Sequence, residues 1–391
     1  MIYIIFIVIL FIFSLVEIIE FGNNILYKKD DKIFFILFSF FMISLSALRY
    51  KTGGDWYHYI PYFDNIKKTY NPLFDMEYGY FLLNVIFKHT FNNYFIMQFF
   101  LELFCGICVY HHIYKYSTHP VFSLFLYFFW MYFSLDMALN RQYLAVAIVL
   151  CGYKYIQKKK FFSYLLIIII AMQFHSSAFA CIVIYFFNKQ LPTYLVCLVF
   201  LFSVCIGFWG HEITLSALKL VYPFMPLRFS SMIDLYLKSS IHTGVIEANT
   251  GLGVIMILLI AGIIVFLNSR KKMNPMFFNS FLVLFLVNRS GVGILGRFNC
   301  YFYLIGGGLF SYNILLDNDF FKKIFSIKYI YFVLVLSYFV FTFYKGTLFV
   351  RHYNWPPMWD LFVPYHIVFS SVDEPGRETL GLLLTRGVFN R

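Results

Sequence analysis

Charge is scarce in this chain, and acidic charge is scarcer than basic charge. Only 13% of the 391 residues are charged, with 19 Asp or Glu against 31 Lys or Arg, while 61% are hydrophobic. The mean hydropathy of +0.74 is more than a soluble core can absorb, so we expect a polytopic helical membrane protein. The net charge of +12 does not indicate nucleic-acid binding, because the lysines are spread between apolar runs and form no single patch.

Cysteine is sparse as well, which excludes a disulfide framework. The seven cysteines lie mostly in or near apolar runs. Cys105 and Cys108 form a C-x-x-C pair, but no second ligand pair accompanies it, so we expect neither a metal nor another cofactor. The first apolar stretch lacks a basic start and a small-residue cleavage site, so it does not read as a cleavable signal peptide.

Apolar runs close to the ~20 residues of a membrane span recur along the chain. They predict an all-α fold with about twelve transmembrane helices. The predicted spans are 2–20, 33–48, 94–112, 120–136, 142–157, 161–174, 176–188, 193–210, 252–268, 277–295, 299–316 and 327–345.

Lysine-rich loops orient these spans, because such loops stay on the cytoplasmic side. Parity then puts two long loops outside, 49–93 and 211–250, and loops of this length are more often functional than idle. Residues 78–90 are short for a span. Counting them as a span would place the lysines at 158–160 on the outer side. We therefore expect an interfacial or re-entrant helix there. The lysine loops are 28–32, 158–160, 270–272 and 322–328.

Arginine is distributed differently from lysine. Six arginines fall in loops or span ends that the same orientation places outside, against the positive-inside preference. Cations kept at the rim of the hydrocarbon are functional candidates, and a planar guanidinium suits phosphate or carboxylate better than an ammonium does. The pattern predicts an anionic ligand at the outer face. The six are Arg49, Arg141, Arg228, Arg289, Arg297 and Arg351.

Two outer segments carry further candidates. In the first loop, Asp55 follows Gly53-Gly54, which lets backbone approach a ligand closely, and Glu77 lies further along. We expect Asp55 and Glu77 to share one outer cavity with Arg49.

Asn140-Arg141-Gln142 opens a span, where the helix dipole disfavours a cation. A ligand that combines with both the arginine and the free helix amides explains its position better. Arg289 and Arg297 bracket a glycine-rich turn at 290–293, which suits a closely approached outer loop.

His175 lies at the tip of a short helical pair, 161–174 and 176–188. A helix of about 14 residues reaches only ~21 Å, less than the ~30 Å of the hydrocarbon core. We therefore expect His175-Ser176-Ser177 to lie below the outer surface, facing protein or a water-filled cavity. The alternative is a histidine that packs against a neighbouring helix.

Four motifs resemble the EpsG/Wzy group of bacterial polysaccharide polymerases. Arg49 with Gly53-Gly54-Asp55 and Tyr59 is similar to that family's R-x-x-x-G-x-D-x-x-x-Y opening. Residues 77–84 are similar to its E-x-G-Y-x-x-L-N segment, 140–147 to its arginine-glutamine helix start, and 174–178 to its F-H-x-S-A turn. The motifs occur in order over residues 48–178, and the second half of the chain matches only in general character.

The resemblance implies a polymerase of the inner membrane, similar in fold to the GT-C superfamily. It implies joining of undecaprenyl-pyrophosphate-linked oligosaccharides at the periplasmic face, with lipid diphosphate as leaving group and no cofactor. Asp55, Glu77 and His175 are the candidate bases. Arg49, Asn140, Arg141, Gln142, Arg289 and Arg297 are the candidate substrate-binding residues. The implied partners are these lipid-linked sugars, membrane lipids and a chain-length regulator.

Other functions share this outer-face chemistry. A flippase or transporter for the same lipid-linked sugar would also need outer arginines, but it would bury charge at mid-span and show internal repeats. A ligase or a lipid-phosphate-sugar glycosyltransferase is a third interpretation. We treat 1–369 as one membrane domain and 370–391 as a more polar tail, disordered or non-native, with no part in the function.

Overall fold

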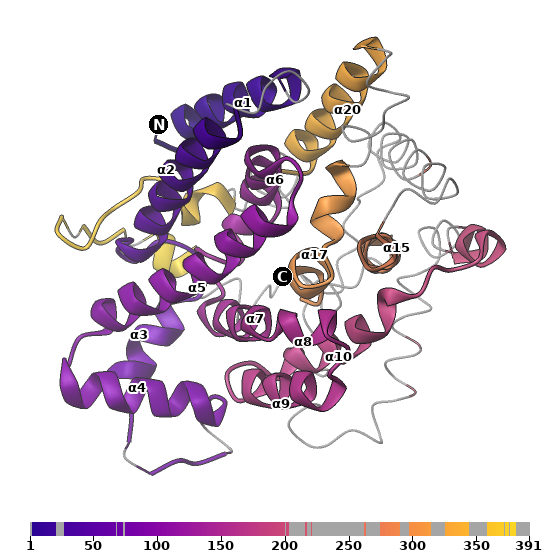
Figure 1. Ribbon diagram of the computed structural model, residues 1–391. Helices are drawn as coiled ribbons and strands as arrows, with labels where there is room; N and C mark the ends of the chain where they lie inside the picture. Colours follow the sequence, from indigo (N-terminus) through magenta and orange to yellow (C-terminus); the bar gives the residue numbers. More distant parts are fainter. Residues whose placement is uncertain are drawn as a thin grey trace.

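The computed structural model describes residues 2–20, 27–67, 69–72, 75–199, 201–202, 274–289, 297–313, 325–343, 358–370, 372–374 and 376–380, with a few isolated residues between. Within these ranges every named element is a helix (Figure 1), and only isolated bridges, such as that between Arg49 and Ile367, pair extended backbone. The prediction of an all-α fold is confirmed for this part of the chain.

Helices from the first third of the chain pack as one bundle. α1 (Ile2–Glu20) lies against α6 (Pro120–Tyr127), and α2 (Tyr27–Ala47) lies against α5 (Tyr94–Tyr116). α6 starts on a proline, and the carboxylate of Glu17 accepts its free amides from Val121 at 3.0 Å and Phe122 at 2.7 Å. A buried anion is favourable here because a helix N-terminus presents unpaired N–H groups and positive potential.

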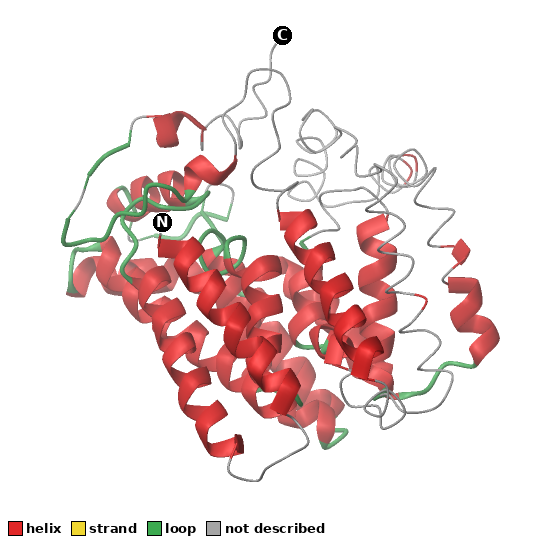
Figure 2. Cartoon of the chain, turned by 90° about the horizontal axis from the view of Figure 1, so that it is seen from above, coloured by secondary structure: helices red, strands yellow, loops and turns green. Residues whose placement is uncertain are grey.

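The outer loop 49–93 contains two helices, α3 (Trp56–Asp64) and α4 (Tyr78–Thr90). Figure 1 shows them together at one side of the bundle, and Figure 2 shows loops gathered at the end where the chain begins. The predicted segment 78–90 is therefore a helix. Its interfacial placement stays a prediction.

The remaining helices complete the described fold. α7 packs against both α5 and α9, and α15 packs against α17. The turn that follows α9 continues as short helical pieces, where a continuous span 176–188 was predicted. The bounds are α7 (Asn140–Cys151), α8 (Tyr153–Gln157), α9 (Phe161–Met172), α10 (Cys181–Ile184), α15 (Pro275–Arg289), α17 (Asn299–Leu304) and α20 (Phe325–Phe343), with the π-helix η1 (Phe128–Tyr132) and the 3₁₀ helices η2 (Ser176–Ala180), η3 (Tyr185–Asn188), η5 (Gly308–Asn313) and η7 (Met358–Leu361).

Exposed apolar faces run along several of these helices. Ile4 of α1, Phe40 of α2, Phe104 of α5 and Leu166 of α9 are each at least 43% exposed, which suits contact with lipid. By length and composition, α5 is the one described helix that could cross a membrane, and shorter apolar helices accompany it. The count of twelve spans stays a prediction, and the span 252–268 and nearly all of the loop 211–250 lie outside the described residues.

Asp136 anchors the centre of the bundle. Its carboxylate accepts hydrogen bonds from Tyr110 of α5 at 2.5 Å, from Tyr127 of α6, and from Tyr143 of α7 at 3.1 Å. Asp136 is fully buried, and a buried carboxylate is costly unless donors surround it. Three hydroxyls from three helices therefore fix the turn that leads into α7.

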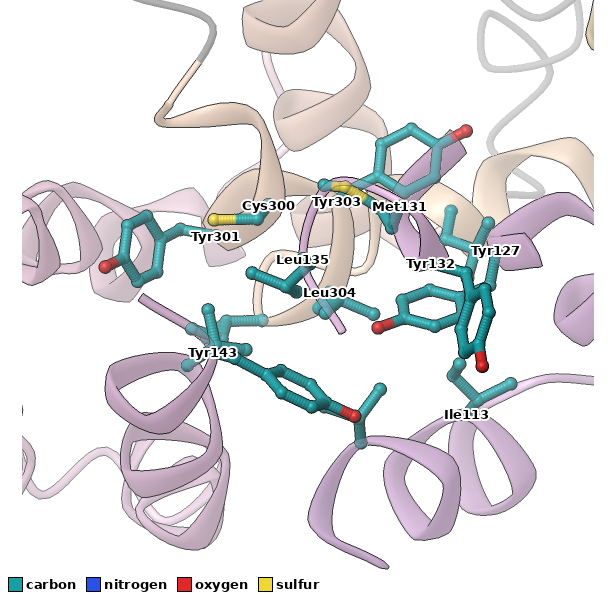
Figure 3. Packing of buried hydrophobic residues seen from close by; sticks show 14 of the residues in the cluster. Ile113, Tyr127, Met131, Tyr132, Leu135, Tyr143, Cys300, Tyr301, Tyr303 and Leu304 are labelled. Carbon is teal, nitrogen blue, oxygen red and sulfur yellow. The ribbon is translucent and has the colours of Figure 1, made fainter. Parts of the chain in front are cut away.

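Aromatic and aliphatic side chains fill the space between this turn and α17. Leu135 and Leu304 lie between Tyr143 and Tyr132 in Figure 3. All four are buried. The start of α7 and the end of α17 are thereby held close together.

Part of the predicted tail packs against the first outer loop. Arg377 is only 4% exposed, and its Nη1 donates to the carbonyl oxygen of Lys51 at 3.2 Å. Asp373 forms an ion pair with Lys51 at 2.6 Å. The described tail residues 372–374 and 376–380 therefore include side chains that pack against the fold, and the disordered or non-native character of 370–391 as a whole stays a prediction. Polar composition alone suggested disorder, whereas the carbonyls of another loop satisfy the arginine.

Candidate functional site

The loop before α3 is shaped by Gly53. Its φ of +105° is one that side-chain-bearing residues rarely adopt, and a Cβ there would come within 2.0 Å of the carbonyl oxygen of Met137. The Gly53 amide donates to Leu361 O at 2.9 Å. Glycine thus lets the loop pack directly against the turn that precedes α7. This packing positions Asp55 beside that turn.

Asp55 stands at the N-terminus of α3 without capping it through its side chain. Its Oδ2 lies 3.5 Å from the hydroxyl of Tyr59, one turn further on. Burial raises the pKa of Asp55, and the guanidiniums of Arg297 and Arg141 oppose that rise only in part. A buried carboxylate with a raised pKa has the properties of a general base.

Glu77 holds Arg141. Glu77 Oε2 accepts from Arg141 Nη1 at 2.7 Å, and the guanidinium carbon lies 5.9 Å from the centre of the Tyr59 ring. Burial acts to raise the pKa of Glu77, but the positive charge of Arg141 outweighs it, so the pKa lies below its ordinary value. Glu77 is therefore an ionised partner of Arg141, which makes it a poorer base than Asp55.

Gly79 brings the start of α4 onto the turn after α9. Its amide donates to Gln173 O at 2.8 Å, and a Cβ on Gly79 would lie 2.9 Å from that same oxygen. The contact lets Glu77 Oε1 accept from the amide of Ser176 at 3.3 Å. Two motifs far apart in sequence therefore meet through a glycine.

His175 sits in that turn, nearly buried at 8% exposure. Its Nδ1 lies 2.6 Å from the hydroxyl of Ser177, which in turn lies 3.0 Å from the hydroxyl of Tyr301 in α17. Burial, and then the positive charge of Arg141, lower the pKa of His175 to about 3. His175 is therefore neutral at physiological pH and a weak base, although its ordinary pKa made it a candidate from sequence.

Gln142 connects α7 to the start of α17. Its Nε2 donates to the carbonyl oxygen of Arg297 and to Cys300 Sγ at 3.0 Å. A cavity of about 320 Å³ opens beside it, and Gln142 Oε1 is buried without a hydrogen-bond partner. The cavity is lined by Trp130, Met131, Ser134, Leu135, Leu139, Gln142, Arg297, Asn299 and Cys300.

Arg49 and Asn140 belong to a separate, closed network. Arg49 Nη1 pairs with Glu102 of α5 at 2.8 Å, and its Nη2 donates to Asn140 Oδ1 at 2.6 Å. Asn140 also donates to the hydroxyl of Tyr94 at 3.1 Å. Arg49 and Asn140 are at most 3% exposed, so in this geometry they hold helices together.

Arg49 was predicted to share one outer cavity with Asp55 and Glu77. Its acidic partner in the structure is Glu102, and the shared cavity stays a prediction. The partners of Arg49 and Glu77 come from α5 and α7, which are distant in sequence. Arg289 ends α15, and its side chain, like residues 290–296, lies outside the described part of the structure.

A family model matches residues 32–366 of the chain, and the matching family is described as the EpsG family. The chain belongs to the EpsG family. This family is associated with Wzy-type polysaccharide polymerases, so a polymerase-type role in polysaccharide biosynthesis follows. No curated protein and no solved structure matches the chain.

All four EpsG motifs fall inside the matched range, and the structure brings three of them into contact through Glu77, Arg141 and Ser176. The match and the exposed apolar helices together indicate a membrane protein.

Sequence reasoning missed several residues of this EpsG protein. Glu102 and Asp136 are fully buried carboxylates within the bundle. Acidic residues in apolar runs were themselves a signal, because a buried carboxylate needs a charged or hydrogen-bonding partner. Tyr59, which contacts Asp55, was part of the first motif. Tyr301, which contacts Ser177, gave no such signal among 32 tyrosines.

Substitutions at His175 separate a hydrogen-bonding role from a base. Because His175 is neutral and bound to Ser177, we expect His175→Asn, whose amide can replace the Nδ1 contact, to keep measurable activity. We expect His175→Ala to lose more, by about tenfold or greater, since the Ser177 hydroxyl then loses one of its two hydrogen-bond partners. In-vitro polymerisation rates measure both, and equal loss of nearly all activity in the two variants would restore the base assignment.

Proposed function

We propose that this protein polymerises undecaprenyl-pyrophosphate-linked oligosaccharide repeat units at the periplasmic face of the bacterial inner membrane. The observation that carries the proposal is the grouping of Asp55 and Arg141 around Tyr59: Asp55 Oδ2 lies 3.5 Å from the Tyr59 hydroxyl, and the guanidinium carbon of Arg141 lies 5.9 Å from the centre of the same ring. The positive charge of Arg297 also opposes the rise in the pKa of Asp55. A developing diphosphate needs fixed positive groups, and an attacking hydroxyl needs a base. The site provides both, on residues of the EpsG motifs and on the start of α17.

The reaction is a glycosyl transfer between two lipid-linked sugars. Asp55 removes the proton from a hydroxyl of the acceptor sugar. That oxygen forms a bond to the anomeric carbon of the growing chain, while the bond from this carbon to the phosphate oxygen breaks. The electron pair leaves with the lipid diphosphate, which Arg141 and Arg297 hold through charge-assisted hydrogen bonds.

Arg141 is prepared for this role by its surroundings. Glu77 accepts a hydrogen bond from Nη1 of the Arg141 guanidinium at 2.7 Å, while Nε of Arg141 is buried without a hydrogen-bond partner. A buried donor without an acceptor is costly, so a ligand oxygen in its reach would be strongly bound. Glu77 orients the guanidinium, and His175 with Ser177 orients the turn that carries the Glu77 contact.

The cavity beside Gln142 suits the sugar part of a substrate. It has both apolar and polar walls, including Trp130 and Ser134, and the unpartnered Oε1 of Gln142 can accept from a sugar hydroxyl. Small-molecule sites are commonly largely apolar with a few placed polar groups.

The experiment is polymerisation by purified protein of a synthetic undecaprenyl-diphosphate-linked repeat. We expect a ladder of products on a gel, with one lipid diphosphate released for each bond formed. Transfer of the lipid-linked sugar across vesicles without a ladder would instead show a flippase. Transfer only onto a chemically different acceptor would show a ligase.

A further inference from the structure

Residues 361–368 are hydrogen-bonded to the loop that carries Asp55. Tyr50 N donates to His366 O at 2.9 Å, Val368 N donates to Leu48 O at 3.0 Å, and Gly53 N donates to Leu361 O at 2.9 Å. Figure 1 shows residues from this part of the chain beside the end of α2 and near α3. Backbone on both sides is thus paired, although the two segments are more than 300 residues apart in the sequence.

The side chain of Arg377 links these two segments through further hydrogen bonds. Its Nη1 donates to Lys51 O at 3.2 Å and lies 3.4 Å from Thr52 Oγ1. On the other side, its Nε donates to Asp360 O at 3.2 Å, and its Nη2 donates to Pro364 O. A planar fork with five donors can hold several oxygens in fixed directions, which a lysine cannot do.

Other contacts around this arginine are weaker. Lys51 pairs with Asp373 at 2.6 Å, but Asp373 is 67% exposed, and Glu374 beside His366 is 36% exposed. Solvent-exposed ion pairs contribute little to stability. Arg377, at 4% exposure, is therefore the charged side chain expected to contribute most to holding the two segments together, beside the three backbone hydrogen bonds and the one from Tyr365 to Leu45 O.

We propose that Arg377 is a positioning residue that sets the place of Asp55. The loop held by Arg377 includes Thr52, which directly precedes Gly53, and Gly53 fits tightly against Met137. Any shift at Lys51–Thr52 therefore moves Asp55 relative to Arg141 on α7. Arg377 lies outside the matched range 32–366. The segment that carries it therefore supports the Asp55 loop with a residue that belongs to none of the four motifs.

Hydrogen–deuterium exchange tests the structural half of this proposal without relying on activity. The Tyr50 and Gly53 amides are bonded to the C-terminal segment, so their peptide should exchange slowly in the intact protein. In Arg377→Ala we expect exchange of this peptide to rise about tenfold or more, because charge-assisted bonds are lost from a buried site. Glu378→Ala, which removes an exposed neighbouring side chain, is the control. Unchanged exchange in Arg377→Ala would overturn the proposal.

Kinetics test the functional half, which rests on the proposed role of Asp55. Misplacing a reacting group by ~1 Å can cost up to ~10²-fold in rate. We expect Arg377→Ala and Arg377→Lys to lower kcat between about tenfold and 10²-fold, with KM little changed and the acid limb of the pH profile displaced. Glu378→Ala should match the unmodified protein.

The outcomes separate the two proposals. If exchange rises in Arg377→Ala while kcat and the pH profile stay unchanged, the positioning role is wrong and Arg377 only stabilises the fold. If the unmodified protein makes no polymer but exchange still rises, the proposed function fails and the attachment of the loop by Arg377 stands.

Discussion

Replacing Arg141 by alanine is expected to abolish polymer ladders while membrane abundance stays near normal. In the proposed mechanism Arg141 supplies a cation to the departing diphosphate, and removal of one such donor from a preorganised site lowers kcat by about 10²–10³-fold. Arg141→Lys should rescue poorly, because an ammonium cannot keep the 2.7 Å contact with Glu77 and also present a second donor in the plane of the guanidinium. Ladders from cells and initial rates from purified protein measure the effect.

Two control variants make this result specific. Lys160→Ala removes an exposed cation from the loop before α9 and should leave the ladders unchanged. Arg49→Ala breaks a buried ion pair with Glu102 and should lower the amount of folded protein, because an unpaired buried carboxylate remains. A normal ladder from Arg141→Ala would remove Arg141 from the substrate site.

Asp55→Asn is expected to reduce the polymerisation rate by about 10²–10⁴-fold, the range for loss of a general base. The amide keeps the shape of the side chain but cannot take the proton of the acceptor hydroxyl. Asp64→Asn is the matched control, since Asp64 ends the same helix with its side chain 58% exposed and 3.6 Å from Lys88. Equal rates for Asp55→Asn and the unmodified protein would exclude Asp55 as the base.

The pH profile gives an independent test of Asp55. The base must be deprotonated, so activity should fall as the pH drops through the pKa of Asp55. Burial raises that pKa, and the acid limb should therefore lie above the ~3.9 of a free aspartate. The limb should be absent from the residual activity of Asp55→Asn. It should persist in His175→Asn, because His175, with a pKa of about 3, is already neutral over the same range.

The sequence was informative about which residues belong to the site, and less so about their partners. Asp55, Glu77, Arg141 and His175 all came from motifs, and the structure brings them together because Gly53 and Gly79 permit close backbone contacts. Their pairings depend on packing between helices distant in sequence. Arg49 and Arg141 have the same predicted location as outer arginines, yet they have different partners. Arg49 pairs with Glu102 of α5, and Arg141 pairs with Glu77 just before α4.

Protonation could not be predicted from residue type either. His175 has the more suitable ordinary pKa for a base, but burial beside Arg141 lowers it, while burial raises that of Asp55. The role of Arg377 was missed for a related reason. A polar composition predicts exposure to solvent. The carbonyl oxygens that accept hydrogen bonds from this arginine belong to Lys51, Asp360 and Pro364, and only the fold determines their arrangement.

The carboxylate of Asp136 has a consequence for how the chain is made. Its three hydroxyl partners come from helices that leave the ribosome at different times, Tyr110 and Tyr127 before it and Tyr143 after it. Hydrocarbon offers no substitute donors. In the predicted topology, the apolar segment that ends in Asp136 therefore lacks its third donor until α7 has emerged, and we expect α5, α6 and α7 to enter the membrane as one cooperative unit. The start of α7, which carries Arg141, would be fixed together with that unit.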